Sequence, residues 1–198
     1  FHSPDLQERE RNLDSALRMA EVAAGLGAPA IRVFGDRIQP GATREQTAQW
    51  IADSLTRLAE KLKPSGVQVW LETHGDFASA SHVSEILARL TDAEVGIIWD
   101  PANIFEQTGE TPHLLPPMTS RVRHVHLKDL TRGVAGTFHY APTGEGEFPF
   151  SAMFTALAGI GFDGFASFEW EKLWHPELAS PEVALPHFIQ WWKGREAA

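Results

Sequence analysis

Short apolar segments alternate with longer amphipathic segments along the whole chain, and this alternation is the feature that most constrains its fold. Apolar runs typical of strands occupy residues 30–35, 67–72, 94–100, 123–128 and 165–169. Runs with helical spacing occupy residues 6–26, 44–63, 81–90, 150–159 and 181–193, and a long glycine-rich loop is expected over 130–148. Strands that alternate with helices form parallel βαβ units with right-handed crossovers. The sequence therefore predicts an α/β fold with a parallel sheet.

Capping signals indicate where two of these helices begin. Thr43, with Gln46 three residues later, matches a capping box at the start of the second helix. Ser81 is the expected cap of the third helix. A proline-rich stretch over residues 111–119 is expected to be only weakly helical.

The last four expected strands have two different faces. In each strand one alternating set of residues is apolar, and the other set contains polar or charged residues that gather at the carboxyl end. An open, doubly wound sheet needs apolar residues on both faces, because helices cover both. A β/α barrel packs its helices on one side and places its active site at the carboxyl ends of the strands. The pattern therefore favours a (β/α)8 barrel.

The length of the chain falls short of a complete barrel. Eight βα units need roughly 250 residues, whereas this chain has 198 residues and five expected strands. We expect residues 1–198 to form a single, partial barrel domain that lacks the first three strands. Bare strand edges favour pairing with another chain, so a homo-oligomer is also expected.

Composition excludes several classes of protein. The formal charge is −9, and binding of nucleic acid needs clustered lysine and arginine, so no nucleic-acid partner is expected. No apolar run approaches the roughly 20 residues of a membrane span, so no membrane partner is expected. The chain contains no cysteine and therefore has neither disulfides nor thiolate metal sites. A soluble, cytoplasmic protein fits these observations.

Four side chains at the ends of successive strands form a candidate metal site. Glu72, Asp100, His126 and Glu169 share the facing that would bring them together at one end of a closed barrel. Three carboxylates and one imidazole favour Mn²⁺, Mg²⁺ or Co²⁺ over Zn²⁺, which prefers cysteine and histidine in structural sites. Unpaired carboxylates inside a barrel are costly, so one bound divalent ion explains this cluster better than packing does.

The order and spacing of five short motifs resemble the xylose isomerase-like TIM barrel superfamily of sugar phosphate isomerases and epimerases. The motifs are Trp70-Leu71-Glu72-Thr73-His74, Ile98-Trp99-Asp100-Pro101-Ala102-Asn103, His124-Val125-His126-Leu127-Lys128-Asp129, Gly144-Glu145-Gly146 and Ser167-Phe168-Glu169. The resemblance covers the chain from about residue 10. It implies that the four candidate ligands match the family's metal ligands one for one, with His126 rather than His124 as the ligand.

Proton transfer next to a carbonyl group is the chemistry that the resemblance implies. In a divalent-metal-dependent isomerase or epimerase of this family, the metal polarises the carbonyl and stabilises an enediolate. Glu72 and Glu169 match the family's acid–base pair and are the expected catalytic residues. The expected partners are small sugars, sugar phosphates or cyclitols.

Five further residues are candidate substrate contacts, namely Arg32, His74, Asn103, Lys128 and Trp174. His74 and Lys128 each follow a candidate ligand by two residues and so share its facing. Arg32 faces inward in an apolar strand, where its partner is either a substrate anion or a barrel carboxylate. Asn103 departs from the family pattern, because epimerases commonly have histidine at this position.

Three other functions stay open from the sequence. A lyase of the same superfamily, of the inosose or 3-dehydroshikimate dehydratase type, would use the same proton abstraction and then eliminate water. A non-catalytic remnant that binds metal or sugar would keep the ligands without turnover. A nuclease of the endonuclease IV type shares the barrel but needs additional histidine ligands, and the charge of −9 disfavours it.

Overall fold

Five parallel strands form one sheet in the computed structural model, which describes residues 1–91 and 94–196. In their order across the sheet, the strands are β1 (Ala30–Phe34), β2 (Gln68–Glu72), β3 (Val95–Trp99), β4 (Val122–Leu127) and β7 (Phe165–Phe168). Leu71 of β2 lies opposite Ile97 of β3, and Val125 of β4 lies opposite Ala166 of β7. The five predicted strands are confirmed, each within one residue of its predicted bounds.

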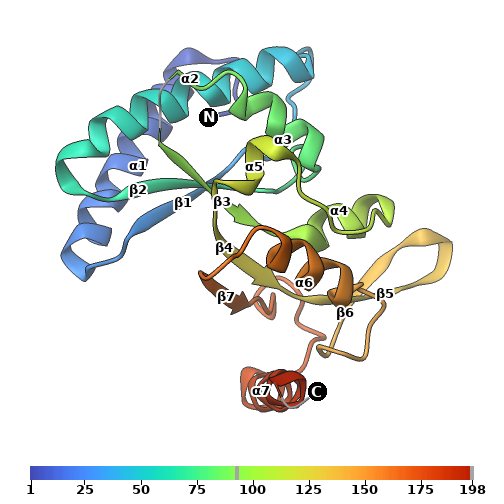
Figure 1. Cartoon of the computed structure of the whole chain (residues 1–198). Helices are drawn as coiled ribbons and strands as arrows, with labels where there is room; N and C mark the ends of the chain where they lie inside the picture. Colours follow the sequence, from blue (N-terminus) through green and yellow to red (C-terminus); the bar gives the residue numbers. More distant parts are fainter. Residues whose placement is uncertain (92–93, 197–198) are drawn as a thin grey trace.

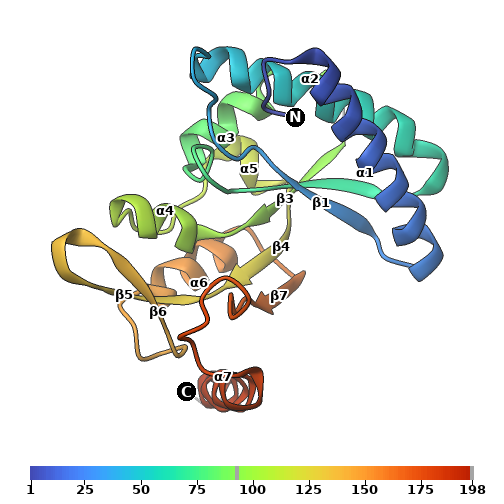
Figure 2. The same cartoon turned by 180° about the vertical axis from the view of Figure 1, so that it is seen from behind.

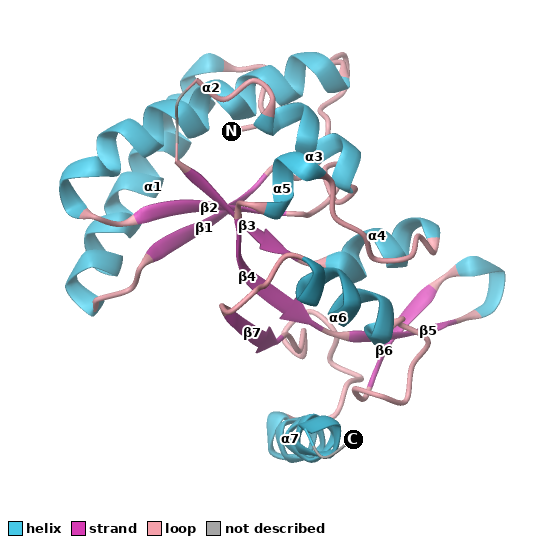
Figure 3. Ribbon diagram, viewed as in Figure 1, coloured by secondary structure: helices cyan, strands magenta, loops and turns pink. Residues whose placement is uncertain are grey.

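Helices alternate with the strands along the chain (Figures 1, 2 and 3). They are α1 (Leu6–Leu26), α2 (Arg44–Leu62), α3 (Ala80–Leu87), α4 (Pro101–Thr108), α5 (Pro116–Thr119), α6 (Phe150–Gly159) and α7 (Pro181–Glu196). α1, α2 and α3 pack side by side, whereas α7 lies apart from them (Figures 1 and 2). α2 packs between α1 and α3 and also contacts β2. No helix in the described part of the chain is both long and apolar enough to cross a bilayer.

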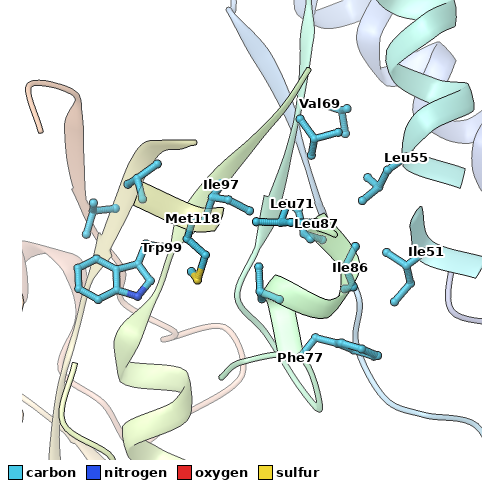
Figure 4. Packing of buried hydrophobic residues seen from close by; sticks show 14 of the residues in the cluster. Ile51, Leu55, Val69, Leu71, Phe77, Ile86, Leu87, Ile97, Trp99 and Met118 are labelled. Atoms are coloured by element: carbon cyan, nitrogen blue, oxygen red, sulfur yellow. The ribbon is translucent and has the colours of Figure 1, made fainter. Parts of the chain in front are cut away.

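An apolar core lies between the sheet and these helices (Figure 4). Its strand residues come from the alternating set predicted to face the helices, among them Val69, Leu71, Ile97 and Trp99, all of them buried. The helices contribute a matching set of buried side chains, among them Ile51, Leu55, Ile86, Leu87 and Met118. Burial of one alternating set fixes the register of each strand, because a slip of one residue would turn that set to the other face.

The opposite face of the sheet carries the other alternating set of side chains. Trp70 lies over the bare backbone of Gly96, where a Cβ would be 2.3 Å from Trp70 Cδ1. His124 Nε2 and Ser167 Oγ lie 2.8 Å apart and link β4 to β7. Trp70 and His124 each precede a candidate ligand by two residues, so they form the layer of side chains beneath the candidate site.

The start of α2 is fixed by the predicted capping box. Thr43 accepts a hydrogen bond from the Gln46 amide, and the Gln46 side chain accepts one from the Thr43 amide. We expect Thr43→Ala to lower the free energy of unfolding by about 1 kcal/mol, measured by urea denaturation, because the cap is lost. Thr43→Ser keeps the hydroxyl and should lose much less. Equal losses in the two variants would show that the cap is not the cause.

The prediction of a loop over residues 130–148 is wrong for the first half of this segment. Residues 129–141 form an antiparallel hairpin of β5 (Asp129–Arg132) and β6 (Phe138–Ala141), joined through a short 3-10 turn at Val134–Gly136. Leu130, which is buried, and Tyr140, which is half-buried, anchor this hairpin. The glycines of the segment lie in the turn and in the loop after β6, so their presence hid two short strands.

Three helical segments also differ from the prediction. Ser79, not Ser81, caps α3, because its hydroxyl accepts the hydrogen bond from the His82 amide. The helix α4 was not predicted, although Asp100 caps it and a proline occupies its first turn. The helical part of residues 111–119 is limited to the single turn of α5.

The sheet is open at both edges, as in part of a (β/α)8 barrel. Among the described residues, each of the strands β1 and β7 pairs with one neighbour only. Beside β1, a groove of about 670 Å³ is lined by α1 side chains that include Met19, Val22 and Leu26. At the other edge, Phe165 of β7 is 82% exposed. The two edges therefore leave apolar surface uncovered.

Candidate metal centre and neighbouring cleft

The four candidate ligands lie at the carboxyl ends of four adjacent strands. Glu72 is the last residue of β2, Asp100 follows β3, His126 is near the end of β4 and Glu169 follows β7. Each offers one ligand atom, and these atoms all lie within 4.8 Å of one another. Parallel strands place their carboxyl ends at one edge of the sheet. Side chains at the ends of adjacent strands therefore lie close together, although they are far apart in the sequence.

The donor atoms of this cluster fit a cation better than they fit one another. Glu72 Oε1, Asp100 Oδ2 and His126 Nδ1 are buried and form no hydrogen bond with the described residues, although Asp100 Oδ2 lies 2.8 Å from Lys128 Nζ. Glu72 Oε1 lies only 2.9 Å from His126 Nδ1, without the geometry of a hydrogen bond. Leaving buried polar atoms without hydrogen bonds is costly, and a divalent ion between them would give Glu72 Oε1 and His126 Nδ1 a partner and would share Asp100 Oδ2 with Lys128.

Burial and mutual charge shift the ionisation of the cluster. Burial would lower the pKa of His126, but contacts with Asp100, Glu169 and Glu72 outweigh it and raise this pKa to about 11. Burial would raise the pKa of Glu169, but His126 and Lys128 hold it below its usual range. Complete burial raises the pKa of Asp100. The three carboxylates around the imidazole therefore favour positive charge at the centre of the cluster.

Two basic side chains flank the cluster and contact its carboxylates. Arg32 Nε donates a hydrogen bond of 2.7 Å to Glu72 Oε2, and a second guanidinium nitrogen also contacts this oxygen. Lys128 Nζ lies 2.8 Å from Asp100 Oδ2 and 2.9 Å from Glu169 Oε2. For Arg32, the structure thus supplies a barrel carboxylate as the partner. Both residues were predicted to contact substrate, and the structure places each of them against candidate ligands.

The other predicted substrate contacts lie around the cluster or beyond it. His74 Nδ1 is buried without a hydrogen-bond partner among the described residues, and its ring lies 4.8 Å from that of Phe34. Asn103 Nδ2 donates to the Thr73 carbonyl at 2.9 Å, which ties α4 to the end of β2. Trp174 is 74% exposed in the loop after β7. His74 therefore follows the candidate ligand Glu72 by two residues, whereas Trp174 extends into solvent.

A cleft of about 540 Å³ lies next to His74 and Asn103. Arg37 and Asp36 line it from the loop after β1, and Gln107 lines it from α4. Its remaining walls come from Gly75, Glu106, Gly136, Thr137 and Phe138. The cleft thus combines the guanidinium of Arg37 with the carboxylates of Asp36 and Glu106 and with several hydrogen-bonding groups, which suits a small polar ligand.

Two polar side chains outside the predicted set, Tyr140 and Glu171, lie beside Lys128 at the site. Tyr140 donates a hydrogen bond of 2.6 Å to Glu171 Oε1, and this oxygen lies 3.4 Å from Lys128 Nζ. Glu171 shares the facing of Glu169, which is the signal in the sequence that could have placed it here. Tyr140 gave no such signal, because it lies on the unpredicted strand β6.

Asp129 is a third residue that the sequence did not single out. Its buried carboxylate accepts hydrogen bonds from the amides of Leu130, Gly144, Gly146 and Phe148. A Cβ on Gly146 would lie 2.2 Å from Asp129 Oδ1, so only glycine permits this approach. The Gly144-Glu145-Gly146 motif is thus explained by the carboxylate that it surrounds.

We expect the purified chain to bind about one divalent ion and Asp100→Asn to weaken that binding by roughly a hundredfold or more. The substitution removes a ligand charge but keeps a side chain that caps helices well, so α4 should still form. The measurement is a titration with Mn²⁺ by calorimetry, with circular dichroism as the test of folding. Unchanged affinity in a folded variant would remove Asp100 from the ligand set.

A parallel β/α sheet with this cluster at its carboxyl edge defines a β/α-barrel protein with a candidate metal centre. Residues 1–193 match the family model described as the xylose isomerase-like TIM barrel. The chain therefore belongs to this family, which confirms the resemblance and the fold class predicted from the sequence.

Curated relatives include carbohydrate isomerases and dehydratases. A 2-oxo-tetronate isomerase of Pectobacterium atrosepticum is 23% identical over 177 residues, covering 84% of this chain and 63% of the relative. Inosose dehydratase 2 of Bacillus cereus is 28% identical over 165 residues, covering 74% of this chain and 55% of the relative. The chain thus spans between about half and two thirds of the length of these relatives.

Solved structures share the fold at low sequence identity. An IolI protein with a bound zinc atom superposes with a TM-score of 0.77 at 18% identity, covering 96% of this chain and 72% of that one. An L-ribulose 3-epimerase gives a TM-score of 0.77 at 18% identity, covering 97% and 69% of the two chains. At this level of identity the likeness shows a shared fold.

Proposed function

We propose that this chain supplies the catalytic part of a divalent-metal-dependent isomerase or epimerase that acts on a small sugar, sugar phosphate or cyclitol. The observation that carries the proposal is the convergence of four ligand atoms within 4.8 Å, two of them from glutamates. A bound divalent ion would polarise a substrate carbonyl as a Lewis acid. The name of the isomerase relative supports a reaction of this class.

The two glutamates differ in their access to a substrate. Glu72 is fully buried and held by Arg32, whereas the Glu169 side chain is 23% exposed. We assign Glu169 as the group that removes the proton next to the carbonyl, and Glu72 as its partner in returning a proton. The Lys128 contact favours ionised Glu169, which is the form that a base requires.

The neighbouring cleft supports a small polar substrate. Arg37 can pair with a carboxylate or phosphate, and His74, Asn103 and Gln107 line the same space. The cleft volume of about 540 Å³ is within the range of pockets for small molecules.

Exchange of substrate hydrogen with solvent tests this function directly. The metal-loaded protein is incubated in D₂O with a panel of ketoses, ketose phosphates and cyclitols, and the products are followed by NMR. We expect deuterium at the carbon next to the carbonyl together with an isomeric product. Absence of both exchange and product across the panel, in a protein shown to hold its metal, would contradict the proposal.

A dehydratase is the second candidate, because inosose dehydratases are among the relatives at up to 28% identity. Such an enzyme abstracts the same proton and then eliminates water, so the product is lighter than the substrate by one water. Mass spectrometry of the same reactions separates the two candidates. An isomer of unchanged mass supports the first, and a dehydrated product supports the second.

A further inference from the structure

Lys128 is among the most enclosed charged side chains of the protein. It follows β4 directly, its side chain is only 2% exposed, and its ammonium lies between the carboxylates of Asp100 and Glu169. A buried ammonium is stable only when it is paired, and here two candidate metal ligands provide the pairing.

The oxygens that Lys128 contacts are also those that face the other ligands. Asp100 Oδ2 lies 3.7 Å from His126 Nδ1, and Glu169 Oε2 lies 3.5 Å from it. An ion held by these three side chains would therefore share both carboxylates with the ammonium. Two cations beside the same oxygens repel each other, and the repulsion is strong where water is excluded.

Lys128 also contacts an acidic side chain outside the ligand group. Glu171 Oε1 lies 3.4 Å from its ammonium and is held in place by the Tyr140 hydroxyl. This carboxylate is not one of the four candidate ligands, so the ammonium keeps a partner when an ion takes up the charge of Asp100 and Glu169.

We propose that Lys128 is the counter-cation of the metal centre: it neutralises Asp100 and Glu169 in the metal-free protein and competes with the ion for them, which sets the affinity of the site. This inference rests on the metal site of the proposed function. It assigns Lys128 a role toward the ligands in place of a contact with substrate. Lys128 is in this sense a positioning residue, since it acts through Asp100 and Glu169.

The test compares Lys128→Met with the wild-type chain and with Lys61→Met, which removes an equal charge from the exposed face of α2. Mn²⁺ affinity is measured by calorimetry at one pH, and thermal unfolding is measured with and without Mn²⁺. We expect Lys128→Met to bind Mn²⁺ roughly tenfold or more tightly and to unfold several degrees lower without metal. Lys61→Met should match the wild type in both measurements.

Glu171→Gln should change the Mn²⁺ affinity in the opposite direction. Without the charge of Glu171, the Lys128 ammonium pairs more strongly with Asp100 and Glu169, so the Mn²⁺ affinity should fall several-fold. If Lys128→Met folds only with metal, the rate of Mn²⁺ loss to a chelator replaces the titration, and slower loss than in the wild type is expected.

The outcomes separate this inference from the proposed function. Weaker Mn²⁺ binding by Lys128→Met would mean that the lysine merely holds the ligands in place, and unchanged affinity would mean that it serves the substrate. Either result overturns the counter-cation role while the metal site stands. Failure of the wild-type chain to bind Mn²⁺ would overturn the proposed function itself, and this inference with it.

Discussion

Glu169→Gln is expected to lower turnover by roughly 10²- to 10⁴-fold, the usual contribution of a general base. The amide cannot accept the proton of the substrate, although it can still contact Lys128 Nζ and has nearly the same shape. The side chain is partly exposed, so the protein should fold normally. The measurement is the rate of solvent deuterium incorporation, with metal content determined in the same samples.

Metal content decides how a loss of activity in this variant is interpreted. Because Glu169 is also a candidate ligand, the comparison is made at Mn²⁺ concentrations that saturate the variant. Glu177→Gln, an exposed change in the same loop, serves as the matched control and should keep full activity. Exchange at the wild-type rate in metal-saturated Glu169→Gln would exclude Glu169 as the base.

Asp129→Asn is expected to destabilise the protein by about 2–4 kcal/mol, the largest effect on stability that we predict for a polar substitution. The carboxylate accepts hydrogen bonds from four backbone amides, two at each of its oxygens. An asparagine side chain would turn an NH₂ group toward two of these amides, leaving buried donors unsatisfied. Urea denaturation followed by circular dichroism measures the loss.

Limited proteolysis locates this effect within the chain. The segment from Gly144 to Phe148 should become the first site of cleavage in Asp129→Asn, because its amides lose their common acceptor. Asp163→Asn, at an exposed turn, is the control and should change stability by less than about 0.5 kcal/mol. A loss of similar size in both variants would exclude a special role of Asp129.

The strands and the candidate ligands were predictable because both depend on local periodicity. Alternation at every second residue fixes which side chains share a face, so Glu72 and His126 could be assigned to one side from the sequence. Parallel pairing then brings the strand ends together without further information. Their convergence within 4.8 Å agrees with this expectation.

The positions that were missed depend on contacts between distant segments. Lys128 was predicted to contact substrate, but its burial was not predicted, because it results from acids that follow β3 and β7. The hairpin of β5 and β6 combines short strands with a glycine-containing turn, and such strands carry little periodicity. The signal for α4 was present in Asp100 and Pro101, but the same aspartate had a second explanation as a ligand.

Asp100 connects the metal centre to the cleft beside it. One carboxylate oxygen caps the first turn of α4, and the other faces the ligand cluster. The helix that begins at this cap carries Asn103 and Gln107 along the cleft. A substitution at Asp100 that removes both oxygens should therefore change the ligand cluster and the wall of the cleft together.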